Sequence, residues 1–192
     1  MDAFNDRTSP AALLATRRSG KARDLVAPGP DAATLRAIVA AAMRVPDHGK
    51  LAPWRFVTVA AHRRAALSDA MVAVLAAEKP DAARVEIDAV RNFAVQAPTL
   101  VVVLARPNPA SPIPEWEQLL SVGAVCGLVC VAAHAEGFVA NWLTGWAAYS
   151  PGVTALLGEP GDRIAGYFFI GSQARPLEER PRPDYAAVVR DW

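Results

Sequence analysis

Residues 115–136 are the feature that most limits how this chain can fold. Their length fits one long helix, and Gly137 follows at the place where helices commonly end. Apolar residues occupy nearly every position around that helix, so it has no polar face to turn toward water. We therefore expect the helix to lie at the centre of a large apolar core.

A chain of 192 residues does not normally build a core of that size, so two explanations stay open. Small residues at Gly123 and Gly127 would allow close contact with a second helix, which favours a homodimer. The alternative is a helix buried within a single chain. The apolar run itself, residues 119–133, is shorter than the roughly 18–20 residues of a membrane span. We expect no membrane insertion.

Composition excludes several other classes of protein. Hydrophobic residues make up 53% of the chain and charged residues 20%, which is typical of a globular domain, here a single one over residues 1–192. A net charge of +1 argues against broad binding to nucleic acid or anionic membranes. Cys126 and Cys130 are too few for a disulfide framework, and we interpret them as small apolar residues of the long helix. Without a recognisable signal peptide, we expect a cytoplasmic protein.

The remaining segments alternate between helical and strand patterns. "RFVTVA" (55–60) and "RIAGYFFIG" (163–171) are typical of strands, and "TLVVVLA" (99–105) has the continuous apolar character of a strand buried on both faces. Helices are predicted from Ser9-Pro10, from Asp31, and within residues 61–79, 81–97 and 151–158. These elements predict an α+β fold in which helices cover a sheet of three or four strands.

Familiar catalytic motifs are absent from the sequence. We find no glycine-rich nucleotide loop, no nucleophile elbow and no metalloprotease motif. The three histidines, His48, His62 and His134, stand far apart and have no partners at metal-ligand spacing, so we expect no metal site. A triad of Ser19, His48 and Asp47 is disfavoured because adjacent side chains on a loop tend to diverge. Any catalytic activity would therefore depend on groups other than these motifs.

The segment "TRRSGKAR" (16–23) concentrates the positive charge of this nearly neutral chain. Arginine forks match phosphate oxygens, and the hydroxyl of Ser19 adds a further donor where a helix ends. Two interpretations stay open from the residues alone: a solvated helix end, or the binding site of a small anion.

Taken in order, several motifs resemble those of the FMN-dependent nitroreductase family, in particular its short YdjA-like subgroup. "RRSGKARDL" is similar to the family's opening motif, and "RVPDHGKLAPW" to its second motif. "PEWEQ", "GFVANWLTG" and "IAGYFFIGSQARP" stand where the family has a subgroup motif, a flavin loop and the last core strand. The resemblance covers nearly the whole chain. It implies a three-layer α+β sandwich, with a mixed but mainly antiparallel sheet, completed by homodimerisation with FMN at the interface.

The resemblance also implies roles for individual residues. Arg17, Arg18 and Ser19 would hold the phosphate and the ribityl chain of FMN, and Lys21 would approach the pyrimidine edge of the flavin. From the second motif, Arg44 and His48 would contact the flavin, with this loop reaching the partner subunit's site. The remaining assignments are flavin-ring contacts at Trp142, Leu143 and Thr144, a further phosphate ligand at Arg175, and contacts to the nicotinamide donor at Ala132, Ala133, His134, Ala135, Glu136 and Gly137.

The implied activity is transfer of hydride from NAD(P)H through FMN to a nitroaromatic, a quinone or a similar acceptor, by a ping-pong mechanism. Because the flavin carries the chemistry, no catalytic side chain is expected. Two rivals remain: a dimeric flavin-storage protein without turnover, and oxygen-dependent chemistry on reduced flavin. Lys50, Ala52 and Leu143 depart from the family pattern.

Overall fold

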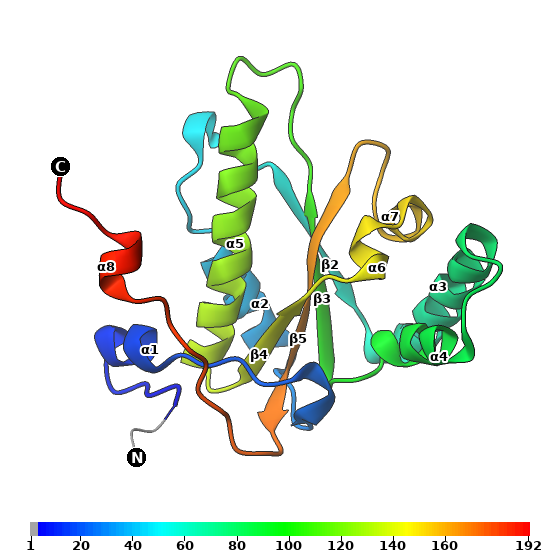
Figure 1. Ribbon diagram of the computed structural model, residues 1–192, viewed down its shortest axis with the longest axis horizontal. Helices are drawn as coiled ribbons and strands as arrows, with labels where there is room; N and C mark the ends of the chain where they lie inside the picture. Colours follow the sequence, from blue (N-terminus) through cyan, green and yellow to red (C-terminus); the bar gives the residue numbers. More distant parts are fainter. Residues whose placement is uncertain (1–3) are drawn as a thin grey trace.

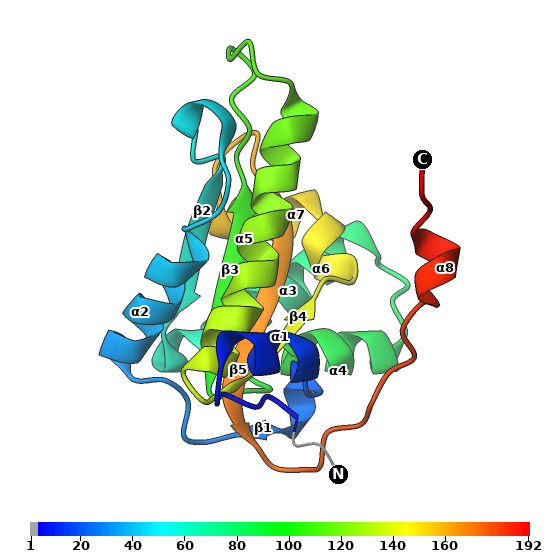
Figure 2. The ribbon, with the colours of Figure 1, turned by 90° about the vertical axis from the view of Figure 1, so that its left-hand side faces the viewer.

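A computed structural model describes residues 4–192, and Figure 1 shows its layers. A twisted sheet lies in the middle. The long helix α5 (Glu115–Ala135) and helix α2 (Ala32–Ala42) cover one face, and α3 (Arg64–Glu78), α4 (Arg84–Phe93), α6 (Trp146–Tyr149) and α7 (Pro151–Leu157) cover the other (Figures 1 and 2). This arrangement confirms the predicted three-layer α+β architecture.

The sheet has five strands, of which four follow the order β1-β5-β3-β2 and β4 also pairs with β5. Their bounds are β1 Leu25–Val26, β2 Trp54–Val59, β3 Thr99–Ala105, β4 Val139–Leu143 and β5 Arg163–Gln173. Every pairing among the described strands is antiparallel, so the expectation of a mixed sheet is wrong. Strand β4 was predicted only as an extended segment or a loop.

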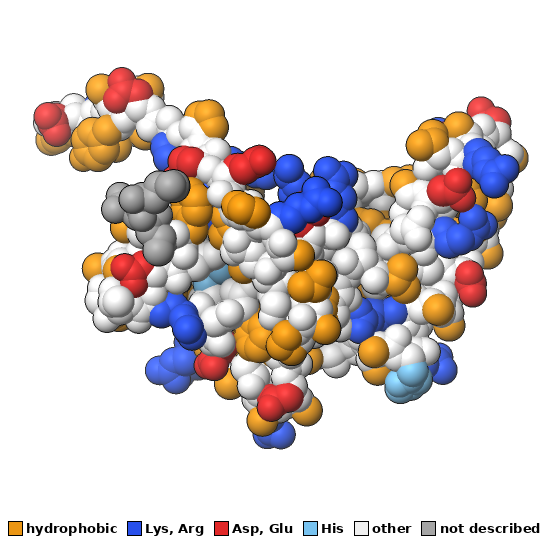
Figure 3. All heavy atoms as spheres, turned by 90° about the horizontal axis from the view of Figure 1, so that it is seen from below, with side chains coloured by type: hydrophobic (Ala, Val, Ile, Leu, Met, Phe, Trp, Pro, Cys, Tyr) orange, Lys and Arg blue, Asp and Glu red, His pale blue; other side chains and the backbone are white. Residues whose placement is uncertain are grey.

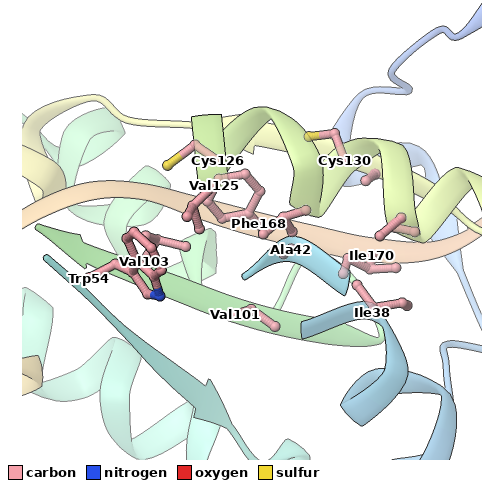
Figure 4. Close-up of a cluster of buried hydrophobic side chains, with 14 of the residues drawn as sticks. Ile38, Ala42, Trp54, Val101, Val103, Val125, Cys126, Cys130, Phe168 and Ile170 are labelled. Atoms are coloured by element: carbon pink, nitrogen blue, oxygen red, sulfur yellow. The ribbon is translucent and has the colours of Figure 1, made fainter. Parts of the chain in front are cut away.

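Strand β3 is buried on both faces and contributes side chains to the hydrophobic clusters on both sides of the sheet. It lies between β2 and β5, and all six residues from Leu100 to Ala105 are buried. Because side chains alternate along a strand, Val101 and Val103 enter the cluster under α5 and α2, while Val102 enters the cluster under α3 and α4. Figure 4 shows the first cluster, with Phe168 packed between the sheet and α5. The prediction of a doubly buried strand is confirmed.

Helix α5 has 21 residues, and its two sides differ. One side packs on the sheet through residues such as Val125, Cys126 and Val129, which are fully buried. The other side is apolar yet exposed in the single chain, with Trp116 and Leu120 at 69% and 54% exposure. The helix is therefore a core helix of the monomer, and it also leaves an uncovered apolar stripe.

The exposed stripe of α5 contains two glycines in mid-helix. A Cβ atom added at Gly123 or Gly127 would meet no atom within 4 Å. Glycine in a helix interior costs about 1 kcal/mol relative to alanine, and nothing in the single chain offsets that cost.

By length and composition, α5 is the one helix of residues 4–192 that could cross a membrane, because an 18-residue window has a mean hydropathy of 1.8. The expectation that this segment is too short was wrong, since the helix extends beyond the apolar run. However, 56% of that window is buried inside the fold, as expected for a core helix.

Shorter helices begin at the caps that the sequence predicts. The side chains of Ser9 and Asp31 accept hydrogen bonds from Ala12 N and Thr34 N at the starts of α1 (Pro10–Thr16) and α2. The C-terminal tail, residues 174–192, follows β5. A final short helix, α8 (Tyr185–Val188), lies on this tail, away from the sheet (Figures 1 and 2). Its apolar side chains Tyr185 and Val188 are exposed in the single chain.

A partly buried ion pair links the residue that follows β3 to the residue that precedes β5. The Arg106 guanidinium donates to both carboxylate oxygens of Asp162, at 2.6 and 2.7 Å, and the Asp162 side chain is fully buried. This hydrogen bond from Arg106 holds the pKa of Asp162 below its usual range. Asp162 also accepts from the backbone N–H of Glu159 at 2.8 Å.

We predict that Asp162→Ala lowers the free energy of unfolding by about 2–3 kcal/mol, because Arg106 loses its buried partner and keeps only the exposed Glu159 carboxylate at 3.0 Å, and because the backbone N–H of Glu159 loses its acceptor. A depressed folded-state pKa stabilises the fold above the unfolded value of about 3.9 and ceases to do so as pH falls through the folded value. Urea unfolding at pH 7 and at pH 3 measures this, and the mutational cost should shrink at pH 3. Asp88→Ala, which removes an exposed pair with Arg91, should cost less than about 1 kcal/mol. Equal costs at both sites would contradict the prediction.

Candidate cofactor site

The basic segment 17–21 leaves helix α1 in an extended conformation. Helix α1 ends at Thr16, and Arg17 takes φ −58° and ψ 123°, outside the helical region. The Arg17 Nη1 group donates to Ser19 Oγ at 3.2 Å, so a guanidinium and a hydroxyl lie side by side. Within residues 4–192, no carboxylate lies within ion-pair distance of Arg17. These two groups are therefore available to an anion.

Arg18 points to the other side of the segment and is engaged by the tail. Its guanidinium is 4% exposed and donates twice to the carbonyl oxygen of Glu178, at 2.7 and 3.2 Å. It also pairs with the Glu179 carboxylate at 2.9 Å, and the ring of Phe4 lies 5.9 Å away. Most of its donors are used in this way. Its contacts make Arg18 an anchor for the tail, and its expected role in phosphate binding stays a prediction.

Lys21 borders a hollow of about 190 Å³ between segment 17–21 and the tail. Its side chain is 56% exposed and lies 3.7 Å from the Glu178 carboxylate. Arg175 also borders the hollow, but it is 77% exposed and pairs with Asp24 at 3.7 Å. On the face seen in Figure 3, Lys and Arg side chains gather next to acidic side chains near the base of the tail. The hollow can accommodate one small anionic group.

Strand β4 brings the second group of predicted flavin residues beside this segment. The Trp142 ring stacks on Phe168 with centroids 5.6 Å apart, and its Nε1 donates to Ala165 O at 3.1 Å. A Cβ atom at residue 166 would lie 2.0 Å from that Nε1, so only glycine leaves space for the ring. Leu143 and Thr144 follow and are half-buried.

Two apolar hollows flank the end of β4. A cleft of about 750 Å³ between α5, β5 and α7 includes Trp142 in its lining. A groove of about 330 Å³ between α3 and α4 reaches Thr144 and has Lys79 and Glu86 at its edge. Both could receive a flat aromatic group.

Asn141 is a site residue that the sequence reasoning missed. It is 8% exposed, and its Nδ2 donates to the carbonyl oxygen of Gly20. Its Oδ1 is buried and has no hydrogen-bond partner in the described residues. An isolated amide in the apolar strand "VANWL" was the available signal. This contact joins the two motifs assigned to the flavin.

The loop of the second motif lies elsewhere. His48 Nδ1 and Glu117 Oε2 are 2.7 Å apart, and Asp47 Oδ2 accepts from Ala52 N at 2.7 Å. Gly49, Lys50 and Ala52 all have positive φ, which is uncommon for the latter two and is often found at functional loops. The contact between His48 and Glu117 thus places the loop against the start of α5. Arg44 is exposed just after α2.

The subgroup motif "PEWEQ" (114–118) contacts two neighbouring loops and holds them in place. Glu117 holds His48, and Gln118 ties down the proline-rich loop by bonding Asn108 N at 2.7 Å and Ile113 O at 3.0 Å. Trp116 belongs to the exposed apolar stripe.

His48 and the Arg17–Ser19 pair lie at opposite ends of α5. His48 contacts Glu117 near the helix start, whereas Arg17 lies close enough to influence the pKa of Cys130 and His134 near its end. At 1.5 Å per residue these ends are about 20 Å apart. This separation rules out a triad of Ser19 and His48. The second-motif residues are therefore not next to segment 17–21 within one chain.

The segment expected to contact the nicotinamide donor is largely internal. Ala132, Ala133 and His134 are buried, whereas Ala135, Glu136 and Gly137 are exposed. Burial lowers the pKa of His134 to about 4, so the imidazole is neutral near pH 7 and carries no charge that would offset the helix dipole. It bonds Cys130 O at 2.5 Å and Ala140 N at 3.4 Å. Any donor contact would involve the exposed half of the segment.

The two thiols of α5 are buried and stay protonated near pH 7. Burial raises the pKa of the Cys126 thiol to about 12 and that of Cys130 to about 11, which supports their interpretation as apolar residues. Among the residues that the structure describes, no cluster of His, Cys, Asp or Glu could hold a metal ion.

The chain matches the description "Nitroreductase family" over residues 14–172. It is 34% identical over 162 residues to the "Putative NAD(P)H nitroreductase YdjA" of Escherichia coli, covering 83% of this chain and 86% of that protein. The crystal structure of a nitroreductase-like family protein from Bacillus cereus superposes with a TM-score of 0.83, at 21% identity and 99% coverage of both chains. A variant of NfnB from Sphigopyxis sp., described as an FMN- and NADPH-dependent nitroreductase, has a TM-score of 0.71 at 22% identity, covering 96% of this chain and 98% of its own. The chain therefore belongs to the nitroreductase family.

Proposed function

We propose that this protein binds FMN and transfers electrons from NAD(P)H to a nitroaromatic, a quinone or a similar acceptor. The main support is the junction of segment 17–21 with β4, where the Arg17 guanidinium and the Ser19 hydroxyl belong to a segment that contacts an apolar strand. Its relatives are named as NAD(P)H nitroreductases, and a structural neighbour is described as FMN- and NADPH-dependent.

The described residues fit FMN at its anionic end. Arg17 and Ser19 offer a fork and a hydroxyl that no carboxylate of residues 4–192 pairs with, and Lys21 lies two residues further along. The apolar hollows beside Trp142 and Thr144 suit a flat ring. Bound FMN would supply the hydride chemistry, and the side chains would bind and orient it and exclude water.

A homodimer belongs to this proposal. The exposed stripe of α5 presents Trp116 and Leu120 together with two glycines that permit close helix contact. The loop of His48 is about 20 Å from segment 17–21 of its own chain. Contact of Arg44 and His48 with a flavin would therefore come from the partner subunit, and each site would be complete only in the dimer. We place the dimer in the cytoplasm.

The rival proposal, a flavin-storage protein, requires the same FMN ligands but no turnover. Steady-state oxidation of NADPH or NADH with a para-quinone acceptor separates the two. The enzyme should turn over and give parallel double-reciprocal lines, as a ping-pong mechanism requires. Absence of turnover with several quinones and nitroaromatics, while FMN stays bound, would favour storage. Turnover that needs dioxygen would favour the oxygen-dependent alternative.

We predict that Lys21→Met retains FMN but lowers its midpoint potential. An ammonium near the pyrimidine edge favours the negatively charged reduced ring over the oxidised ring. A preference of about 1.4 kcal/mol corresponds to roughly 30 mV for a two-electron couple. Because Lys21 is half-exposed and has only a 3.7 Å contact with Glu178, its loss should not disturb the fold. Spectroelectrochemistry of the FMN-loaded variant measures the shift. An unchanged potential would place Lys21 at the phosphate or in solvent.

A further inference from the structure

We propose that Asn141 is a positioning residue that orients segment 17–21 for the phosphate of the cofactor. The inference rests on the proposed function and adds a residue to its binding site. Asn141 is poorly placed to touch a ligand itself, since its residue exposure is 8% and its side-chain oxygen is fully covered. Its effect would therefore pass through the backbone of Gly20.

The amide has one defined orientation. Asn141 faces a carbonyl oxygen, that of Gly20, so its NH₂ group must point there and its Oδ1 must point away. Neighbouring residues on this side of β4 are apolar, with Val139 and Leu143 in the second core cluster. The side chain thus makes a single cross-link from the strand to segment 17–21.

Gly20 has little freedom at this junction. A Cβ atom there would lie 3.0 Å from Val139 Cγ1 and 3.3 Å from Leu25 Cδ2. The hydrogen bond from Asn141 orients the Gly20 carbonyl and so the peptide plane that follows Gly20, while the side chain of Val139 limits the space at Gly20 and so restricts the plane that precedes it. These planes set the directions in which Ser19 and Lys21 leave the backbone, and Ser19 in turn receives the Arg17 guanidinium.

A core role alone does not explain an asparagine at this position. A buried amide oxygen without a partner costs about 1–3 kcal/mol, whereas leucine has a similar volume and no polar atom to satisfy. What asparagine supplies here, and leucine does not, is a donor for Gly20. That donor acts on the segment that offers Arg17 and Ser19 to an anion.

The test compares FMN with riboflavin, which has the same ring and ribityl chain but no phosphate. For the wild type and for Asn141→Leu, dissociation constants come from quenching of flavin fluorescence by the apoprotein. We expect the ratio of riboflavin to FMN dissociation constants to fall about tenfold in the variant. Asn92→Leu, which removes an exposed amide that donates to Asp88 O in α4, is the matched control and should leave the ratio unchanged.

Each outcome decides the matter. An unchanged ratio, whether both affinities stay the same or fall together, would show that Asn141 is only a structural residue and overturn the inference. If the wild type binds neither flavin, the proposed function fails and this inference with it. Should Asn141→Leu fail to fold by circular dichroism, Asn141→Ser gives the same comparison with a smaller side chain. A lowered ratio for Asn141→Ser would support the inference, and an unchanged ratio would overturn it.

Discussion

Arg17→Ala should weaken FMN binding about thirtyfold and leave the fold intact. A charge-assisted hydrogen bond to phosphate contributes roughly 1.5–3 kcal/mol, and a loss of about 2 kcal/mol corresponds to that factor. The side chain bonds only Ser19 Oγ within the described residues and has no carboxylate partner, so its removal leaves no charge behind. Isothermal titration of the apoprotein with FMN measures the loss.

Arg23→Ala is the matched control for this prediction. Arg23 belongs to the same basic stretch but is exposed in a short 3₁₀ turn, and its loss should change the FMN affinity less than twofold. Full affinity in Arg17→Ala would contradict the phosphate assignment. In that case the anion would have to bind in the hollow beside Lys21 and the tail.

Gly123→Arg should convert the proposed dimer to monomers. A Cβ atom at this position meets nothing within 4 Å in the single chain, so the monomer itself tolerates a side chain there. In a dimer packed through α5, a guanidinium would be buried without a partner at a cost of several kcal/mol, which raises the dimer dissociation constant by at least about a hundredfold. Light scattering after size-exclusion chromatography would give the 20.4 kDa mass of one chain.

Ala73→Arg, on the exposed side of α3, is the control and should stay dimeric. Because the His48 loop would come from the partner, Gly123→Arg should also bind FMN more weakly. A folded Gly123→Arg dimer with twice the chain mass would contradict an interface through α5.

Local patterns predicted those elements in which the neighbours in sequence decide the structure. The apolar run of β3, the caps at Ser9 and Asp31, and the length of α5 each follow from residues within one element. Strand β4 did not, because its five residues become a strand only by pairing with β5, about 30 residues away in sequence. The expectation that some strands are parallel was wrong for a similar reason, because the direction of a strand depends on how distant segments connect across the sheet.

The candidate site divides in the same way. The charge cluster at Arg17 was visible in the sequence, but its split into two sides was not, since it depends on the tail meeting Arg18. The Asn141–Gly20 and His48–Glu117 contacts join residues 121 and 69 positions apart, and no local pattern encodes them. Family resemblance supplied the flavin residues, and the fold supplied the contacts that hold them.

Anaerobic mixing of the FMN-loaded protein with NADPH or NADH is the most direct test of an FMN-dependent oxidoreductase. We predict that the absorption band of the oxidised flavin, at about 450 nm, bleaches with one equivalent of the reduced nicotinamide and returns when a para-quinone is added under argon. Bound FMN that keeps its oxidised spectrum with an excess of both NADPH and NADH would contradict the proposed function.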